Sequence, residues 1–133
     1  MGGRDAANSA DAGKVDLALL DAAVTLTREY EAPILEQAPM EPMTATAHVT
    51  AKGADVWLST QYADGVRSAV RSVTRLDTAD IRVHPMALGG GFGRKAETDY
   101  ATQAAIISQE VGAPVKVIWS RAETTRHGYY RPP

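Results

Sequence analysis

The sequence predicts an α+β fold, a mixed β-sheet with two main helices packed on it, within a single domain. Two observations predict it. Several short runs alternate apolar and polar residues with a period of two, and two longer runs repeat apolar residues at helical spacing. Because these runs follow one another as strand, helix, strand, the helices are expected to cover the sheet.

Length and composition limit the class of protein. The 133 residues, 44% hydrophobic and 23% charged with a net charge of −2, are typical of one soluble globular domain. Without a basic excess, nucleic-acid binding is not expected. The absence of cysteine excludes disulfides, thiolate metal sites and cysteine-ligated iron–sulfur clusters within the chain. No apolar run approaches the roughly 20 residues that span a bilayer.

The first part of the chain offers little apolar surface to bury. Residues 1–14 have almost no large apolar side chains, so we expect a disordered leader there. Apolar residues at helical spacing then predict a short helix over residues 15–23. β-Branched and aromatic residues predict a strand over residues 25–31, ended by Pro33.

The middle of the chain reads as a loop, a hairpin and a helix. Two prolines make residues 38–42 an extended loop. Strand patterns over residues 44–51 and 54–60, with Lys52-Gly53 as the turn, predict an antiparallel hairpin. Valines at i, i+4 and i+7 predict an amphipathic helix over residues 63–75, whose arginine row is best explained as a solvated face.

A second strand, helix, strand unit follows. We expect a short strand over residues 81–85, a helix over residues 97–110 that ends at Gly112, and a strand over residues 114–119. The last strand is mostly apolar, which is typical of a strand covered on both faces. The buried stripe of the helix is expected to comprise Tyr100, Ala104, Ile107 and Val111, with Ala101 and Ala105 allowing a close approach.

A glycine loop joins the strand ending at Pro85 to the second long helix. It reads Gly89-Gly90-Gly91-Phe92-Gly93-Arg94-Lys95. Successive glycines are costly to order, so they indicate positive φ angles or a close approach to the backbone. Main-chain N–H groups, with Arg94 and Lys95 adding positive charge, would suit an anionic or oxo-bearing ligand. A connection without a ligand explains the loop alone equally well.

Gln61, at the end of the hairpin, is a second candidate for ligand binding. Its primary amide offers two donors and one acceptor without charge, which suits hydrogen bonding to an oxo group. Glu41 stands between Met40 and Pro42, where local capping or pairing is the simpler interpretation. The three histidines share no metal-site spacing, so we expect no metal bound by protein side chains.

Several motifs occur in one order along the chain. They are Tyr30-Glu31-Ala32-Pro33, Ala38-Pro39-Met40-Glu41-Pro42, Trp57-Leu58-Ser59-Thr60-Gln61, Gly89 to Lys95, Pro114-Val115-Lys116-Val117, and Ser120-Arg121 with His127-Gly128 and Tyr130-Arg131-Pro132. With this order and spacing the chain resembles the molybdopterin-binding subunit of the xanthine dehydrogenase and aldehyde oxidase family, most closely its bacterial isoquinoline 1-oxidoreductase beta-subunit branch. The resemblance implies that residues 15–133 are a molybdenum-cofactor-binding domain, a fragment of a larger hydroxylase subunit.

The resemblance also implies a cofactor site. In this family the dithiolene sulfurs of a pterin hold the molybdenum, which fits a chain without cysteine. A glutamine matching Gln61 hydrogen-bonds the apical oxo group, and backbone matching Phe92 and Gly93 lines the cofactor. The candidate cofactor-binding residues are therefore Gln61, Gly90, Gly91, Phe92, Gly93 and Arg94. No catalytic residue is assigned, because the family's general-base glutamate lies far toward the C-terminus of a full-length subunit.

Two positions depart from the family pattern. Ala96 stands where many members have a substrate-binding acid, so either Glu97 supplies that acid or the purine-binding role is absent. Gln37 stands where relatives of the closer branch commonly have a histidine.

The resemblance implies two partners in the parent enzyme, the remainder of the molybdenum subunit and an iron–sulfur electron-transfer subunit, in the bacterial cytoplasm or periplasm. The isolated chain is expected to be inactive and to bind no cofactor. The alternative is a stand-alone, non-catalytic binding or interaction domain that retains the fold. Phosphate or nucleotide binding by the glycine loop is a third option, although the loop lacks both the Walker and the dinucleotide patterns.

Overall fold

The computed structural model describes residues 12–131, which divide after Ala32 into two units. Most of the expected disordered leader, residues 1–11, lies outside the described residues. In the first unit, helix α1 (Val15–Leu20) confirms the short helix. The strand expected over residues 25–31 is wrong: these residues are exposed and form no ladder. Strand propensity reflects the fit of a side chain to a half-buried pleated surface, and no such surface is formed here.

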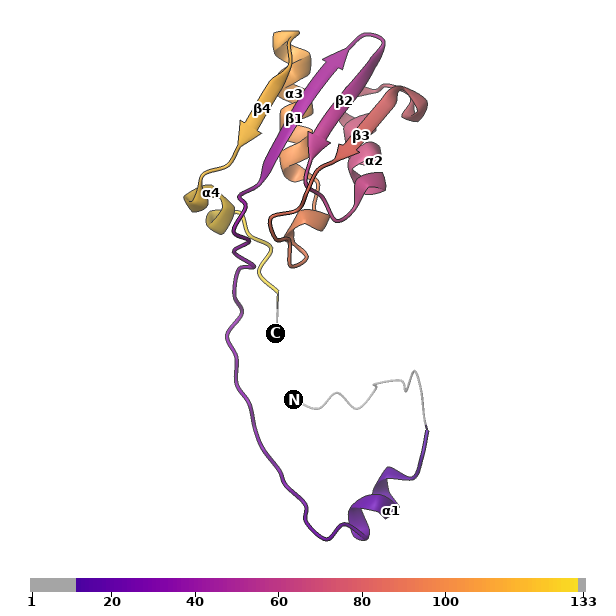
Figure 1. Cartoon of the computed structure of the whole chain (residues 1–133), viewed down its shortest axis with the longest axis vertical. Coiled ribbons are helices and arrows are strands. Elements are labelled where there is room, and N and C mark those ends of the chain that lie inside the picture. Colours follow the sequence, from indigo (N-terminus) through magenta and orange to yellow (C-terminus); the bar gives the residue numbers. More distant parts are fainter. Residues whose placement is uncertain (1–11, 132–133) are drawn as a thin grey trace. The chain divides into compact units, whose positions relative to one another are not determined.

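The second unit, from Pro33 onward, contains one four-stranded mixed sheet in the order β3-β2-β1-β4 (Figure 1). The strands are β1 (Thr44–Thr50), β2 (Gly53–Leu58), β3 (Ile81–Pro85) and β4 (Val115–Ile118). Strand β1 is antiparallel to both β2 and β4, whereas β2 and β3 are parallel. The predicted hairpin is confirmed, but its turn is one residue earlier than expected: Thr50 pairs with Gly53 across Ala51 and Lys52, so Gly53 belongs to β2.

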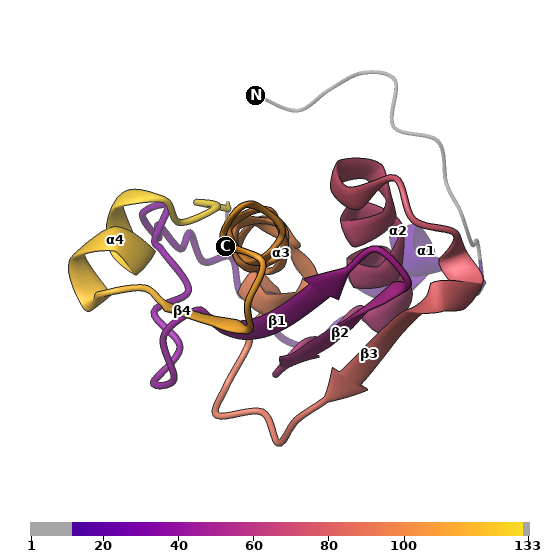
Figure 2. The ribbon, with the colours of Figure 1, turned by 90° about the horizontal axis from the view of Figure 1, so that it is seen from above.

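Two long helices lie on the same face of this sheet (Figure 2). Helix α2 (Ala63–Thr74) connects β2 to β3, and α3 (Asp99–Val111) leads toward β4. Both were predicted, whereas the short helix α4 (Arg121–Arg126) was not. Among residues 12–131, no helix combines the length and the apolar character needed to cross a membrane.

The core lies between the sheet and these two helices. Alternate residues of β1 point into it, as the period of two requires. Val66 and Val70 of α2 are fully buried, as their spacing predicted. The main buried side chains from the sheet and α3 are Ala45, Ala47, Val49, Val56, Leu58, Tyr100, Ala101, Ala104 and Ala105. Small alanines on both β1 and α3 let the helix approach the sheet closely.

The expected stripe of α3 is only half right. Tyr100 and Ala104 are buried, but Ile107 and Val111 are 43% and 59% exposed. The close approach expected at Ala101 and Ala105 is confirmed, since both are fully buried, and Ser108 is buried on the same side. The prediction followed the bulky residues Ile107 and Val111, but the face of α3 that packs on the sheet is the neighbouring one, which carries small residues.

Strand β4 is the edge strand beside β1, and none of its residues is fully buried, so the expectation that it is covered on both faces is wrong. Lys116 and Ile118 are exposed, and Val115 and Val117 are half-buried. The helices cover one face of the sheet, and β4 therefore keeps an exposed face despite its mostly apolar sequence.

A buried serine continues the hydrogen bonding of β1 past the end of β4. Strand β4 pairs with β1 only from Thr44 to Ala47. Farther along, the N–H of Val49 donates to Oγ of Ser108 at 2.9 Å, and Ser108 Oγ donates to the carbonyl of Ala113 at 2.8 Å. One side chain thereby joins β1, α3 and the loop before β4.

We predict that Ser108→Ala destabilises the fold by about 1–3 kcal/mol, because it leaves the buried N–H of Val49 without an acceptor. Ser72→Ala, on the exposed side of α2, is the matched control and should change stability by less than about 0.5 kcal/mol. Both replacements change helix propensity alike. Urea unfolding followed by circular dichroism measures the difference, and equal values for the two variants would contradict this role of Ser108.

Candidate functional site

Gln61 and the glycine loop (residues 89–95) meet at one edge of the sheet. Gln61 follows β2 and the glycine loop follows β3. Because β2 and β3 are parallel, their carboxyl ends share an edge. The N–H of Gln61 donates to the carbonyl of Lys95 at 2.9 Å, and the N–H of Gly93 donates to Oε1 of Gln61 at 3.0 Å. The structure thus brings together two segments that the sequence separates by about 30 residues.

The contact with Gly93 fixes the orientation of the Gln61 amide. An N–H donor requires an oxygen, so Oε1 faces Gly93 and the NH₂ group is directed away from that contact. Gln61 is exposed, and its Nε2 has no acceptor among residues 12–131. The amide therefore presents an oriented, uncharged pair of donors beside the glycine loop.

Two glycines of the loop are required by their backbone conformation. Gly90 and Gly93 have φ angles of +94° and +87°. A side chain at Gly93 would meet nothing within 4 Å, so the conformation alone requires glycine there. Phe92 also lies in the left-handed region, at φ +49°, and its side chain is 71% exposed. A non-glycine residue in this region is a local strain that the surrounding structure must compensate.

Two other glycines allow a close approach of neighbouring side chains. A Cβ at Gly91 would lie 2.4 Å from Oε1 of Gln61, and one at Gly89 would lie 2.7 Å from Cβ of Glu41. The sequence predicted positive φ angles or close approach, and both occur. These contacts also show that the loop packs directly on the two residues that precede and follow the hairpin.

The loop has main-chain donors with no partner. The N–H of Arg94 donates to the carbonyl of Gly91 at 2.8 Å, which closes the turn. Within the described part of the chain, the N–H groups of Gly90, Gly91 and Phe92 have no acceptor. Successive N–H groups in such a turn form a binding site for an anion or an electron-rich oxygen.

A buried ion pair anchors the loop to the 38–42 segment. Lys95 is fully buried, and its Nζ donates to Oε2 of Glu41 and, at 2.9 Å, to Oγ of Ser59. The same Glu41 oxygen accepts the N–H of Gly89 at 2.7 Å. The expectation that Glu41 pairs locally is therefore wrong, because its partners lie 48 and 54 residues away.

The pKa of Glu41 is lowered by this arrangement. Burial of the carboxyl group, the largest single effect, acts to raise the pKa, but hydrogen bonds from Lys95, Gly89 and Ser59 together outweigh it. The carboxylate form is thus the one that the site stabilises.

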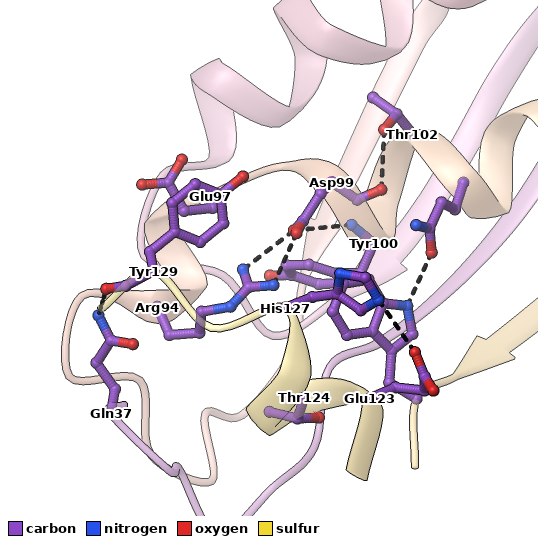
Figure 3. A network of polar contacts seen from close by, with 12 residues as sticks. Gln37, Arg94, Glu97, Asp99, Tyr100, Thr102, Glu123, Thr124, His127 and Tyr129 are labelled. Carbon is purple, nitrogen blue, oxygen red and sulfur yellow. Dashed lines mark hydrogen bonds and ion pairs between the residues drawn. The ribbon is translucent and has the colours of Figure 1, made fainter. Parts of the chain in front are cut away.

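Arg94, directly after Gly93, is also fully buried (Figure 3). Its guanidinium binds both carboxylate oxygens of Asp99, at 3.0 and 2.7 Å. It also lies over the rings of Trp119 and Tyr129, 5.3 and 4.9 Å from their centroids. The expectation that Arg94 and Lys95 add positive charge to the loop is not met, because each cation is buried against a carboxylate.

The C-terminal segment (residues 119–131) lies against this part of the fold. Nε2 of Gln37 donates to the carbonyl of Tyr129 at 2.9 Å. Arg131 pairs with Glu97 at 2.8 Å, so the candidate for a displaced substrate-binding acid is engaged in an ion pair. Gln37, which departs from the pattern of the closer relatives, thus serves to attach the C-terminal segment.

The histidines form no metal site within the described residues, where no group of three or more metal-ligating side chains occurs. His84 contacts Asp55 at 2.7 Å and stacks on Trp57. A bidentate contact from Arg82, with His84 adding to it, lowers the pKa of Asp55. This cluster lies on β2 and β3, on the polar side of the sheet.

A glycine loop and a fixed amide stand at the carboxyl ends of two parallel strands, and this is the edge at which open sheets commonly bind ligands. Residues 3–133 match the molybdopterin cofactor-binding domain, and the chain belongs to that family. The family indicated by the motifs is therefore confirmed.

Among curated proteins, two bacterial relatives illustrate the match. The beta subunit of isoquinoline 1-oxidoreductase from Brevundimonas diminuta is 33% identical over 104 residues, which are 77% of this chain and 13% of the relative. The molybdenum-binding subunit of an aldehyde oxidoreductase from Escherichia coli is 30% identical over 122 residues, which are 90% of this chain and 16% of the relative. The chain thus spans about a sixth or less of the length of these relatives.

Two solved structures contain a region with a similar fold. Quinoline 2-oxidoreductase from Pseudomonas putida 86 superposes with a TM-score of 0.64 and 25% identity, covering 84% of this chain and 14% of that one. A reconstituted CO dehydrogenase from Oligotropha carboxidovorans superposes with a TM-score of 0.62 and 26% identity, over 68% of this chain and 12% of that one. The fold of this chain thus recurs as a small part of larger oxidoreductase chains.

We predict that Glu41→Gln destabilises the fold by about 1–3 kcal/mol at neutral pH, because the buried Lys95 loses its charged partner. The folded pKa of Glu41 lies below its ordinary value of 4.5, so its stabilising contribution is complete above about pH 4.5 and is lost as the pH falls through the lowered pKa. Urea unfolding between pH 3 and 7 should therefore show that the difference in unfolding free energy between wild type and variant becomes smaller as the pH falls below about 4.5.

Glu123→Gln is the control for this prediction. Glu123 makes an exposed ion pair with Arg126, so its replacement should change stability by less than about 0.5 kcal/mol. A gap between wild type and Glu41→Gln that stays constant down to pH 3 would contradict the assignment.

Proposed function

We propose that this domain contributes to binding the molybdopterin cofactor of a larger molybdenum hydroxylase subunit. The observation that carries the proposal is the hydrogen bond from the N–H of Gly93 to Oε1 of Gln61 at 3.0 Å. It directs the amide NH₂ of Gln61 away from Gly93, and the unpaired N–H groups of the loop lie at the same edge of the sheet. Membership in the molybdopterin cofactor-binding domain family supports this ligand.

The available groups fit such a cofactor. The amide of Gln61 and the N–H groups of Gly90, Gly91 and Phe92 are uncharged donors, which suit oxygen and nitrogen acceptors. The chain has no cysteine, which fits a metal whose sulfur ligands come from the pterin. When bound, the cofactor supplies the redox chemistry of hydroxylation. The residues of this chain bind and orient it through dipoles that are fixed before binding.

The proposed roles differ among the candidate residues. Gln61 donates to the oxo group, the N–H groups of Gly90, Gly91 and Phe92 bind the rest of the cofactor, and Gly93 orients the amide. The side chain of Arg94 is buried, so Arg94 contributes by supporting the loop from inside the fold and not by contacting the cofactor.

We further propose that the isolated chain is inactive and retains no cofactor. The relatives are named as subunits of oxidoreductases, and the chain spans 13% and 16% of two of them. The remainder of a molybdenum subunit and an iron–sulfur electron-transfer subunit are the partners in this proposal. A stand-alone binding domain is the second candidate, and it differs by forming a stable product that never contains molybdenum or pterin in any assembly.

The test exchanges the matching segment of the Escherichia coli aldehyde oxidoreductase subunit for this chain. We expect the chimera to retain molybdenum and pterin, measured by elemental analysis and by fluorescence of the oxidised pterin. Gly93→Val should lower both contents about tenfold or more, since a β-branched residue excludes the positive φ of the loop. The isolated chain, prepared in parallel, should contain neither and should not oxidise aldehydes.

Gly112→Val is the matched control for Gly93→Val. Gly112 also has a positive φ, +65°, and no atom within 4 Å of an added Cβ, but it ends α3 away from the loop. Valine at Gly112 also meets a positive φ but does not touch the loop, so cofactor content should remain within about twofold of the parent chimera. Equal losses in both variants, or full occupancy in Gly93→Val, would sink the proposed role of the loop.

Gln61→Ala should leave cofactor content nearly unchanged and slow aldehyde turnover by about 2- to 13-fold, the equivalent of one neutral hydrogen bond of about 0.5–1.5 kcal/mol. Gln61→Glu keeps an acceptor for Gly93 but replaces the donor by a negative charge, and should be slower still. Gln109→Ala, an exposed amide on α3, serves as the control. Wild-type turnover in both Gln61 variants would remove Gln61 from the site.

A further inference from the structure

Arg94 receives contacts from two separate parts of the fold. Asp99 belongs to α3, whereas Trp119 and Tyr129 belong to the C-terminal segment. Figure 3 shows Asp99 and Tyr129 beside the side chain of Arg94. All three contact the guanidinium of Arg94, through two hydrogen bonds from Arg94 to the carboxylate and through both aromatic rings. The side chain of Arg94 therefore connects the glycine loop to α3 and to the C-terminal segment, whose Trp119 and Tyr129 follow Arg94 by 25 and 35 residues.

These contacts require arginine specifically. A guanidinium is planar, donates two parallel hydrogen bonds to a carboxylate and stacks on aromatic rings. A lysine at this position would keep the charge and one hydrogen bond to Asp99, but it would lose the second hydrogen bond and the stacking. The side chain is fully buried, so it makes its contacts inside the fold and not with a ligand at the surface.

The backbone of Arg94 is part of the loop whose donors are proposed to bind the cofactor. Its N–H closes the turn on the carbonyl of Gly91, and the preceding residue, Gly93, orients the amide of Gln61. A guanidinium fixed on one side of this turn therefore fixes the turn itself. The main-chain carbonyl of Tyr129 accepts a hydrogen bond from Gln37. Tyr129 is therefore attached to the fold through its main chain and through its ring.

We infer that Arg94 is a positioning residue, through which the C-terminal segment sets the geometry of the donors in the glycine loop. The segment is then a functional part of the site although it presents no group to the ligand. The identity of the ligand rests on the proposed function, whereas the coupling between segment and loop stands independently of it.

The coupling is tested first in the 133-residue chain by hydrogen exchange. Tyr129→Ala removes one ring from Arg94 and should speed exchange of the N–H groups of Gln61, Gly93 and Arg94 by about tenfold or more. Exchange in the β1–β2 hairpin should not change. Tyr130→Ala, whose ring belongs to the same segment but not to the Arg94 contact, should have less than a twofold effect. Tyr129→Phe keeps the ring and should restore slow exchange.

A double-mutant comparison identifies Arg94 as the link. Arg94→Lys should speed exchange at the same N–H groups, and Tyr129→Ala should then add less than a further twofold in the Arg94→Lys background. Full additivity of the two effects, or unchanged exchange in Tyr129→Ala, would overturn the inference. If Arg94→Lys does not fold, the comparison of Tyr129→Ala with Tyr129→Phe and Tyr130→Ala decides the matter alone.

Cofactor content of the chimera provides the functional readout. Tyr129→Ala should lower molybdenum and pterin content about threefold or more, while Tyr129→Phe and Tyr130→Ala retain them. Faster exchange with unchanged cofactor content would overturn the functional part of the inference. A chimera that retains no cofactor in any form would instead count against the proposed function, and the exchange rates would still decide the coupling.

Discussion

The arrangement of the site depends on one buried ammonium group, that of Lys95. A cation removed from water is stable only if it is paired and hydrogen-bonded, and Lys95 finds this in Glu41 and Ser59. These two partners belong to the loop before β1 and to the end of β2. Satisfying one charge therefore brings three segments to one edge of the sheet and leaves the glycine loop packed on Gln61.

Arg94 and Lys95 are consecutive residues that bind different carboxylates, Asp99 and Glu41. The turn after the glycine loop is thus attached at once to α3 and to the loop before β1. Because both cations are neutralised inside the fold, the unpaired donors of the glycine loop and of Gln61 are uncharged. Such donors contribute direction more than attraction, which suits a site whose task is to orient a group that carries its own chemistry.

Sequence reasoning recovered the elements that leave a local pattern. The hairpin, α2, β3 and the glycine loop each have their own periodicity or composition, and parallel pairing of β2 and β3 then brings Gln61 to the loop. The same reasoning missed the features that depend on contacts between residues far apart in the sequence. The Glu41 to Lys95 pair spans 54 residues, the rotation of α3 follows from the surface that the sheet offers, and β4 is apolar although it lies at an edge. None of these features produces a local sequence pattern from which it could be predicted.

Ser108 has a consequence for how this domain meets other protein chains. An edge strand with open backbone N–H groups is a template on which a foreign strand can add, and this leads to aggregation. Strand β4 is too short to cover β1 as far as Val49, but the hydroxyl of Ser108 occupies the N–H there. A side chain inserted from a helix satisfies that position without extending the sheet, so the part of β1 beyond β4 is protected from strand addition by a single buried hydroxyl.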